Sequence, residues 1–299
     1  MKENNTAWLI DSSIYVFKAW FTYPDHEDAN GKPINAVLGF LEFVYGLLRY
    51  ENVGQIAFAF DESLKTSYRR DIYPEYKANR PPAPESLRYQ FRLCREFIDA
   101  LGIHQQASSR YEADDLIGTW AAYLNRKSIP VNIITADKDL AQLVSDGDIW
   151  WEYLRGEKFD NKKILKRFGV RPSQIADQLA IAGDKTDNIP GVPGIGMSTA
   201  AKLLRKFDNL EQLFNRVNEI SAMQIRGAVR IQSLIAEYQD TVLLSRRLTE
   251  IVCDIEDIPE TQFNIKAHKG DKLVRLCNQL NLSEGYTHNW LNLQLDRQL

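Results

Sequence analysis

Three short apolar runs in this chain each lead into an aspartate. Asp11 follows Ala-Trp-Leu-Ile, Asp61 follows Gln-Ile-Ala-Phe-Ala-Phe, and Asp137 comes shortly after Val-Asn-Ile-Ile-Thr. Runs of this kind predict buried strands, and the helical patterns between them predict an α/β fold with a mostly parallel central sheet flanked by helices. Because sites in open α/β sheets form at the carboxyl ends of the strands, we expect the three aspartates to converge.

Six further acidic residues follow in three groups. They are Glu112, Asp114 and Asp115, then Asp139, then Asp184 and Asp187. So many like charges cannot share a small volume without binding protons or cations. Oxygen ligands favour Mg²⁺ and Mn²⁺, and pairs of such ions catalyse phosphodiester hydrolysis. The alternative for any single aspartate is a turn or a helix cap, and a helix N-terminus would by itself favour Glu112 and Asp115.

The composition indicates a globular protein of the reducing cytosol. The chain has 299 residues, a formal net charge of -3 and three scattered cysteines, which give no disulfide framework. No apolar run is long enough for a membrane helix, and the N-terminus lacks the pattern of a secretory signal. The sequence therefore predicts a cytoplasmic protein with no membrane partner. The small negative charge does not exclude nucleic acid, because the distribution of charge matters more than its sum.

Basic residues gather between Lys65 and Arg95. This stretch holds eight basic side chains against three acidic ones, with tyrosines interleaved, and a Pro-Pro-Ala-Pro run interrupts it. We expect two helical arms on either side of a turn, which would form a basic helical arch over residues 62–100. Cations between aromatic rings suit single-stranded nucleic acid, and the alternative is a solvated helix pair. The candidate DNA-binding residues of the arch are Lys65, Arg69, Arg70, Lys77 and Arg80.

A glycine-rich hairpin lies in the second half of the chain. Gly191-Val-Pro-Gly194-Ile-Gly196 is followed by a helical pattern near Ser198, which predicts a helix–hairpin–helix. Glycines let the backbone approach a phosphate, and the next helix presents free N–H groups to it. Gly191, Gly194, Gly196 and Ser198 are therefore candidate duplex contacts, and the hairpin carbonyls are a candidate site for K⁺. The alternative is a loop that only needs a flexible backbone.

The periodicity divides the chain into three parts. Residues 7–60 predict strand, loop, helix (36–50) and strand; a helix at 86–101, a short strand at 102–104, a helix from 112 and a strand at 131–135 follow. We expect a nuclease core at 1–171 that includes the arch, a helix–hairpin–helix subdomain at 172–255, and an extension at 256–299 that packs back on the core.

The order of these motifs resembles the 5′-nuclease family. The resemblance rests on Leu-Ile-Asp11, Phe-Asp61, Tyr-Pro-Glu-Tyr-Lys77-Ala-Asn-Arg80-Pro-Pro, Glu112-Ala-Asp114-Asp115, Thr-Ala-Asp137-Lys-Asp139 and Gly-Asp184-Lys-Thr-Asp187-Asn-Ile-Pro-Gly. The family includes the 5′–3′ exonuclease domain of bacterial DNA polymerase I, phage 5′-exonucleases and flap endonucleases. It implies a PIN-like core and a two-metal nuclease that cuts DNA at 5′ single-stranded ends and flap junctions, in replication or repair.

The resemblance also implies roles for single residues. The first metal would be bound by Asp11, Asp61, Glu112, Asp114 and Asp115. Asp137 and Asp139 would lie between the metals, and Asp184 with Asp187 would complete the second site. Lys77 matches the arch lysine that contacts the scissile phosphate, and Arg80 matches the arginine one turn on. The expected catalytic residues are thus Lys77, Arg80, Asp115 and Asp137.

The sequence departs from the usual family motifs at two places, and two other functions remain as alternatives. Ile-Asp-Ser-Ser stands where the family usually has Asp-Gly, and Met197-Ser198 stands where a Pro/Glu–Lys pair is common. One rival is a structure-specific DNA-binding protein with weak or no cleavage, which an incomplete carboxylate set would favour. The other is a PIN-type ribonuclease, which would be shorter and lack the arch and hairpin. No polymerase domain follows, so we expect a freestanding monomeric form.

Overall fold

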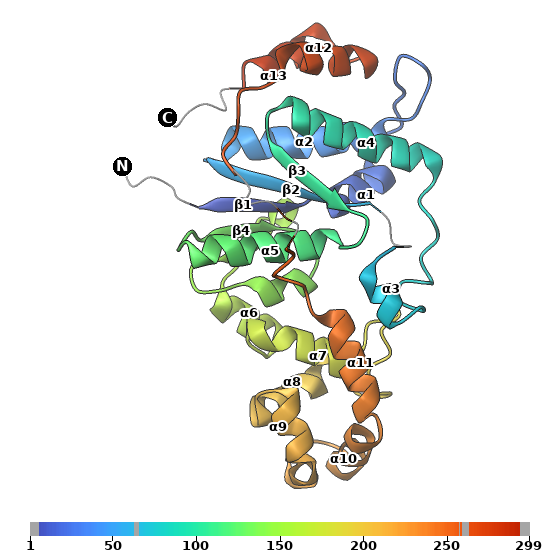
Figure 1. Ribbon diagram of the computed structural model, residues 1–299, viewed down its shortest axis with the longest axis vertical. Coiled ribbons are helices and arrows are strands. Elements are labelled where there is room, and N and C mark those ends of the chain that lie inside the picture. The colour runs from blue at the N-terminus through green and yellow to red at the C-terminus, as the bar shows by residue number, and fades with distance from the viewer. Residues whose placement is uncertain (1–5, 63–65, 257, 259–262, 294–299) are drawn as a thin grey trace.

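In the computed structural model, a six-stranded sheet forms the centre of the molecule (Figure 1). The structure describes all residues except 1–5, 63–65, 257, 259–262 and 294–299. The strands are β1 (Ala7–Asp11), β2 (Gln55–Asp61), β3 (His104–Ser108), β4 (Val131–Ile134), β5 (Ile149–Glu152) and β6 (Glu157–Phe159). Their order is β3-β2-β1-β4-β5-β6, and all neighbours are parallel except β5 and β6. The sheet is therefore mostly parallel, as the sequence predicted.

Both faces of the sheet are covered, which explains why the strands are apolar throughout. In β1, Ala7 and Leu9 face one core cluster, whereas Trp8 and Ile10 face the other. One face carries α1 (Ser12–Thr22), α2 (Asn35–Tyr50) and α4 (Glu85–Ala100). The opposite face carries α5 (Ala113–Arg126) and α6 (Asn161–Phe168). Short 3-10 helices follow β4 and β5, at Asp139–Leu143 and Tyr153–Arg155.

Several elements differ from the sequence prediction. A helix, α1, begins directly after β1 where a loop was expected, and Asp11, with an extended backbone, is its N-cap residue. The predicted short strand at 102–104 lies instead at His104–Ser108. Strands β5 and β6 were not predicted, since each has at most four residues and carries little periodicity.

The arch differs from the predicted pair of helical arms. Between β2 and the proline run, the described residues form one short helix, α3 (Tyr68–Ile72), followed by turns. The second expected arm, α4, is a core helix that buries Leu87, Leu93 and Phe97 against the sheet. Proline at residues 81, 82 and 84 keeps the connection between them extended.

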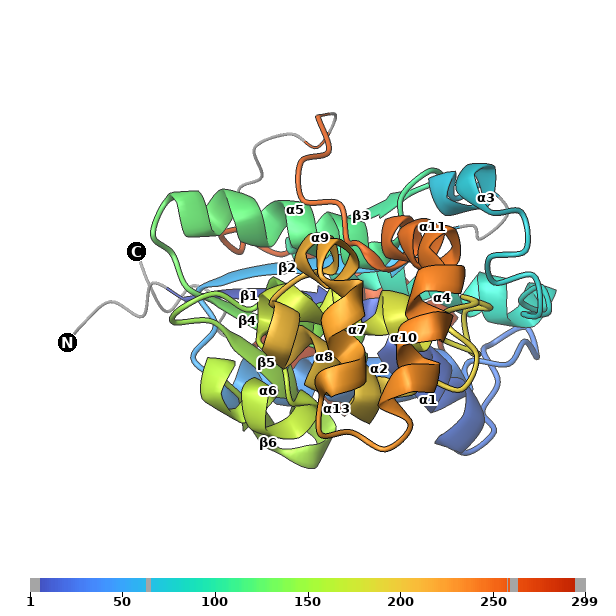
Figure 2. The ribbon, with the colours of Figure 1, turned by 90° about the horizontal axis from the view of Figure 1, so that it is seen from below.

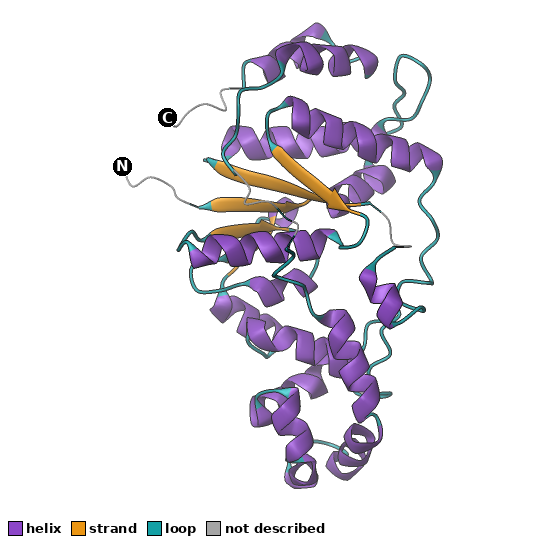
Figure 3. Cartoon of the chain, in the orientation of Figure 1, coloured by secondary structure: helices purple, strands orange, loops and turns teal. Residues whose placement is uncertain are grey.

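The second part of the chain consists of helices, as the coloured cartoon shows (Figure 3). After a 3-10 turn at Pro172–Gln174 come α7 (Ile175–Ala182), α8 (Met197–Phe207), α9 (Leu210–Asn215), a 3-10 helix (Val217–Ala222), α10 (Ala228–Glu237) and α11 (Gln239–Thr249). Seen from below, α11 lies beside α3, so this part contacts the base of the arch (Figure 2).

The chain then returns to the core. Phe263 accepts a hydrogen bond from the backbone of Ile56 at 2.7 Å. Helices α12 (Gly270–Gln279) and α13 (Glu284–Leu291) lie over α2 and α4, and the Trp290 ring contacts Phe97 and Tyr45 at centroid distances of 5.0 and 5.1 Å. Within the described ranges, no helix has both the length and the apolar character needed to cross a bilayer.

Candidate active site

The alternation of the strands directs two aspartates to the same side of the sheet. Side chains two residues apart in a strand point to the same face, so Asp11 shares the face of Leu9 and Asp61 that of Ala59. Both carboxylates therefore lie on the α5 side of the sheet, at the carboxyl ends of β1 and β2. The chain moves to opposite sides of β1 in forming β2 and β4. This is the topological switch point, where open α/β sheets place their ligands.

Hydrogen bonds fix these carboxylates to their neighbours. The backbone N–H of Ala113 donates to Asp61 Oδ1 at 2.9 Å, which ties the start of α5 to the end of β2. The Thr135 hydroxyl donates to Asp11 Oδ2 at 2.7 Å and accepts from the N–H of Asp137 at 2.9 Å. The serine pair that departs from the family motif also takes part, because Ser13 Oγ accepts from the N–H of Asp61. Asp11, Asp61 and Asp137 are thus brought together as predicted.

Four carboxylates of this group lack a cationic partner. Within the described residues, no ion pair joins Asp11, Asp61, Asp114 or Asp137 to a lysine or arginine. Burial, together with the charges of Asp61 and Asp137, raises the pKa of Asp11 to about 7. Burial and the charges of Asp137 and Asp11 raise the pKa of Asp114 well above its usual value. The group therefore carries more negative charge than its surroundings offset, and a cation would stabilise it.

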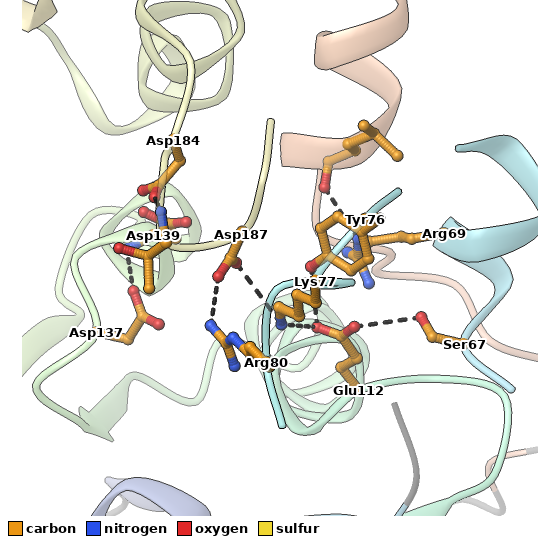
Figure 4. A network of polar contacts seen from close by, with 12 residues as sticks. Ser67, Arg69, Tyr76, Lys77, Arg80, Glu112, Asp137, Asp139, Asp184 and Asp187 are labelled. Atoms are coloured by element: carbon orange, nitrogen blue, oxygen red, sulfur yellow. Dashed lines mark hydrogen bonds and ion pairs between the residues drawn. The ribbon is translucent and has the colours of Figure 1, made fainter. Parts of the chain in front are cut away.

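A second set of carboxylates is already paired with cations (Figure 4). Lys77 Nζ lies 2.6 Å from Glu112 Oε2 and 3.6 Å from Asp187 Oδ2, and Arg80 also contacts Asp187. On the other side, Lys138 Nζ lies 2.6 Å from Asp184. The three cations come from the arch and from the motif that contains Asp137.

The pKa values in this second set follow the pairing. Burial opposes ionisation of Glu112, but the charges of Lys77 and Arg69 and the hydrogen bonds it accepts outweigh burial and lower its pKa to about 2. Burial likewise opposes ionisation of Asp184, and the hydrogen bond from Lys138 lowers its pKa nonetheless. Asp139 behaves differently, because burial and the neighbouring charge of Asp137 raise its pKa to about 7. Its Oδ1 atom is buried and accepts no hydrogen bond.

The arch is docked on the loop that carries Asp184 and Asp187. The N–H of Lys77 donates to the carbonyl of Asp187 at 2.9 Å, and the Asn188 side chain donates to the carbonyl of Glu75 at 2.7 Å. Lys77 adopts a left-handed backbone conformation with φ of 50°. In this conformation the N–H of Lys77 meets the backbone carbonyl of Asp187, and its ammonium meets the carboxylates of Glu112 and Asp187.

Two predicted site residues require correction. Asp115 was expected to bind metal and to be catalytic, and Arg69 to contact DNA. Instead they form a buried pair, with 0% and 3% of their side chains exposed. Both oxygens of Asp115 accept hydrogen bonds from Arg69 and from the backbone N–H groups of Glu112 and Val252. Charge counting missed this because it does not show which side of a helix is buried, and both residues lie in helices, α3 and α5.

Three other predicted DNA contacts, Lys65, Arg70 and Gly191, are not placed as exposed, unoccupied groups. Lys65 lies outside the described residues. Arg70 folds back onto the carbonyl of Pro74. Gly191 is buried, and an added Cβ would lie 2.2 Å from the backbone nitrogen of Gly183, so this glycine is required for packing and is not a surface contact.

The exposed part of the hairpin remains available to a ligand. Gly194, Gly196 and Ser198 are exposed at the start of α8, as the prediction requires. Arg230 from α10 lies beside them, with a guanidinium nitrogen 3.8 Å from where a Cβ of Gly194 would be. The sequence prediction missed Arg230, which lies far from the hairpin in sequence and carries no local signal.

Other residues of the site were also missed. Ser67, Tyr76, Thr135 and Lys138 all hold predicted carboxylates. A sequence signal existed for Lys138, which lies between Asp137 and Asp139, and for Tyr76, which precedes Lys77. Thr135 also had one, because it lies two residues before Asp137 in the Thr-Ala-Asp137-Lys-Asp139 motif, whereas Ser67 had none.

The donor set fits a hard divalent metal by its chemistry, although not by its present arrangement. In the part of the chain that the structure describes, no three carboxylate, imidazole or thiol groups lie close enough to hold one ion together. All donors of the cluster are oxygens, and four carboxylates form no ion pair within the described residues. The buried Asp139 Oδ1 accepts no hydrogen bond there, although Lys138 Nζ lies 3.6 Å away. The side chains would bind a metal such as Mg²⁺ after turning toward a common point.

Comparison with known proteins identifies the family. The profile of the 5′-3′ exonuclease N-terminal resolvase-like domain matches residues 6–169, and that of the 5′-3′ exonuclease C-terminal SAM fold matches residues 170–272. The chain belongs to the 5′-3′ exonuclease family. This result confirms the resemblance seen in the sequence and the predicted 5′-nuclease class.

Curated relatives agree with this assignment. The chain is 33% identical over 254 residues to a 5′-3′ exonuclease of Buchnera aphidicola (subsp. Acyrthosiphon pisum), a match that covers 85% of this chain and 88% of the relative. It is 35% identical over 286 residues to DNA polymerase I of Pseudomonas aeruginosa, covering 95% of this chain and 31% of that enzyme.

Solved structures share the fold at low sequence identity. The 5′-exonuclease of bacteriophage T5 with bound zinc superposes with a TM-score of 0.63 at 17% identity, covering 96% of this chain and 99% of the other. The catalytic core of Rad2 in complex with DNA gives a TM-score of 0.64 at 16% identity, covering 97% and 92%. These likenesses confirm the architecture of a parallel sheet with a helical second part.

Proposed function

We propose that this 5′-3′ exonuclease family member is a Mg²⁺-dependent nuclease that hydrolyses DNA at 5′ single-stranded ends and at flap junctions. One observation carries the proposal: Asp11, Asp61, Asp114 and Asp137 converge without cationic partners at the switch point of the sheet, beside Lys77. Mn²⁺ is expected to substitute for Mg²⁺. The solved relatives with divalent metal ions or DNA support the same chemistry.

We propose two metal sites for this cluster. Asp11, Asp61, Glu112 and Asp114 would hold the first ion, Asp184 and Asp187 the second, and Asp137 and Asp139 would lie between them. When bound, such ions lower the pKa of a water molecule and stabilise the leaving oxygen of a phosphodiester. No side-chain nucleophile is needed. Glu112 is paired with Lys77, and Asp184 and Asp187 are paired with Lys138 and Arg80, so these ion pairs must rearrange before the first and second sites can form.

The cations of the arch would act on the phosphate. Lys77 and Arg80 reach the carboxylates from the arch side, and an ammonium in this position would offset negative charge that develops on the reacting phosphate. The arch would hold the 5′ single strand. Gly194, Gly196, Ser198 and Arg230 would bind the backbone of the adjoining duplex, and the hairpin carbonyls are the proposed K⁺ site.

Cleavage of labelled DNA tests this function. Flap, nicked and blunt substrates that carry a 5′ label would be incubated with the monomeric protein in Mg²⁺, Mn²⁺ and a chelator. The proposal expects metal-dependent release of 5′ fragments from the flap and nicked substrates. Binding of the flap substrate without cleavage in either metal would favour the rival interpretation, a structure-specific DNA-binding protein. Preferential cleavage of RNA would favour a ribonuclease.

A further inference from the structure

Arg69 and Asp115 form a buried ion pair whose two side chains also hydrogen-bond to backbone groups. The guanidinium nitrogens Nη1 and Nη2 lie 2.7 and 2.8 Å from the two carboxylate oxygens, and the pair is buried. A buried pair of charges is costly unless its remaining hydrogen-bonding groups also find partners. Apolar residues of similar size could stabilise the same location equally well, so stability alone does not explain the pair. A bidentate ion pair does fix the relative orientation of the two segments that carry it.

The pair joins three segments that are distant in sequence. Arg69 belongs to α3 at the base of the arch, and Asp115 to the first turn of α5. Arg69 Nε donates to the carbonyl of Leu248 at 2.9 Å, and Nη2 donates to that of Glu250 at 2.7 Å. The N–H of Val252 donates to Asp115 Oδ1 at 2.9 Å. The end of α11, and with it the second part of the chain, is thereby fixed to the arch and to α5.

The same pair sets the position of Glu112. Asp115 Oδ2 accepts a hydrogen bond from the N–H of Glu112 at 3.0 Å, which fixes its backbone. The Glu112 carboxylate accepts from Ser67 Oγ at 3.2 Å, from Tyr76 at 3.2 Å and from Lys77 at 2.6 Å. All three donors belong to the arch segment that Arg69 holds in place. Both ends of Glu112 therefore depend on this ion pair.

We infer that Arg69 and Asp115 are positioning residues that hold Glu112 in place to bind metal and that fix the arch and the end of α11 to the same point. Neither side chain is placed to touch metal or DNA itself. The inference rests on the proposed function, because it assigns Glu112 to the first metal site. Loss of groups that orient a metal ligand lowers metal affinity by about 10–100-fold, while the chemistry at saturating metal is retained.

The test compares Asp115→Asn with a matched control. Arg110 and Asp71 also join α3 to the residues before α5, at 2.6 Å, but this pair is more than half exposed on both sides. Asp71→Asn is therefore the control variant. Thermal unfolding would first establish that each variant is folded at the assay temperature. Binding of Mn²⁺ to the DNA-free protein would then be measured by electron paramagnetic resonance, and the single-turnover rate on a 5′ flap would be measured across a Mg²⁺ titration.

We expect Asp115→Asn to weaken Mn²⁺ binding by about 10–100-fold and to shift the Mg²⁺ titration by a similar factor. The rate at saturating Mg²⁺ should return close to that of the unchanged protein, and Asp71→Asn should change neither quantity. Unchanged Mn²⁺ affinity with a lower unfolding temperature would overturn the inference in favour of a merely structural pair. A rate that stays abolished at saturating Mg²⁺ would overturn it in favour of a direct ligand.

A second set of variants covers the case in which Asp115→Asn does not fold. Arg69→Lys keeps a positive charge beside Asp115 but loses the bidentate contact to its carboxylate and one of the contacts to backbone carbonyls. The double variant Arg69→Gln/Asp115→Asn removes both charges together. The inference expects weakened Mn²⁺ binding in both, and unchanged binding in both would overturn it. The Mn²⁺ measurement needs no cleavage. If the unchanged protein bound Mn²⁺ but cut no substrate, the proposed function would fail while this inference was still decided by the affinities.

Discussion

Lys77 Nζ lies between Glu112 Oε2 and Asp187 Oδ2, at 2.6 and 3.6 Å, so one ammonium bridges the first turn of α5 and the loop before the hairpin. Burial opposes this charge, but the charges of Glu112 and Asp187 raise the pKa of Lys77 well above its usual value. The lysine is therefore charged across the pH range of any assay.

Lys77→Ala should lower the rate of cleavage more than the affinity for DNA. One cation at the reacting phosphate acts mainly as charge develops, so its loss should raise the barrier by roughly 2–4 kcal/mol. Single-turnover rates at saturating DNA, with dissociation constants measured in Ca²⁺, separate the two effects. Arg88→Ala is the control, because Arg88 is exposed on α4 away from the carboxylates. A loss confined to affinity would make the arch a positioning surface alone.

Asp114→Asn should abolish cleavage and stabilise the metal-free protein. The side chain lies among Asp137, Asp11 and Asp61, and its pKa is raised by burial and by these charges. Removing its charge relieves the repulsion but also removes a metal ligand. Thermal unfolding in a chelator and single-turnover cleavage in Mg²⁺ measure the two effects. Asp254→Asn, outside the cluster, should leave both unchanged. Retained turnover by Asp114→Asn would remove this residue from the ligand set.

Without metal, the protein should become less stable as the pH rises from about 4 to 7. Asp11 and Asp139 have pKa values raised to about 7 in the folded state, from 3.8, so the folded protein binds more protons than the unfolded chain in this window. This contribution to stability is fully present below pH 3.8 and is lost as the pH rises through 7. The loss is about 4 kcal/mol for each carboxylate, because one pKa unit corresponds to about 1.4 kcal/mol. Glu112, with its pKa lowered to about 2, contributes stability that is lost only below pH 4.5.

Chemical denaturation in a chelator at several pH values measures this dependence. Excess Mg²⁺ should flatten it and stabilise the protein most at pH 8, because the ion binds the ionised carboxylates. A stability that rises between pH 5 and 7 in the chelator would contradict the arrangement of buried, unpaired carboxylates.

Asp184→Asn and Asp187→Asn should slow cleavage and raise the Mg²⁺ concentration that gives the half-maximal rate. Each change removes one oxygen ligand of the proposed second site and also weakens an ion pair, with Lys138 or with Arg80. A Mg²⁺ titration of the single-turnover rate measures the effect. Asp208→Asn, which weakens an exposed ion pair with Arg171, is the control. An unchanged titration would reassign Asp184 and Asp187 to holding the arch.

The carboxylate site could be predicted from sequence because its parts follow local rules. Strand alternation and the switch-point rule place Asp11, Asp61 and Asp137 together, and motif order shows the family. The assignments of Asp115 and Arg69 failed because their partners lie far away: Arg69 and the carbonyl of Leu248 are 179 residues apart. Glu112 and Asp115 also had a capping alternative, and for Asp115 the capping contact to Glu112 is present. Periodicity carries no information about such contacts.

The arch shows a second limit. The sequence predicted two helical arms for this stretch, but it did not show which of their charges are buried and which are exposed. The structure buries Arg69 and Tyr76, exposes Arg80 and places Lys77 between them. Only the fold determines which of these cations remains free to meet a phosphate.

Arg230→Ala should weaken binding to DNA that contains a duplex, without changing the single-turnover rate at saturation. Arg230 is exposed on α10 beside Gly194, and within the described residues no hydrogen bond or ion pair engages its guanidinium, so it is placed to meet the phosphate that the hairpin would bind. Loss of one phosphate contact should reduce the slope of log K against log salt by about 0.9. Binding to single-stranded DNA should not change, because that strand would follow the arch.

Titrations of flap and single-stranded DNA in Ca²⁺ at several salt concentrations measure both effects, with Lys162→Ala on α6 as the control. An unchanged salt slope would mean that the duplex does not reach α10, and equal weakening for both DNA forms would mean that the two strands share this surface.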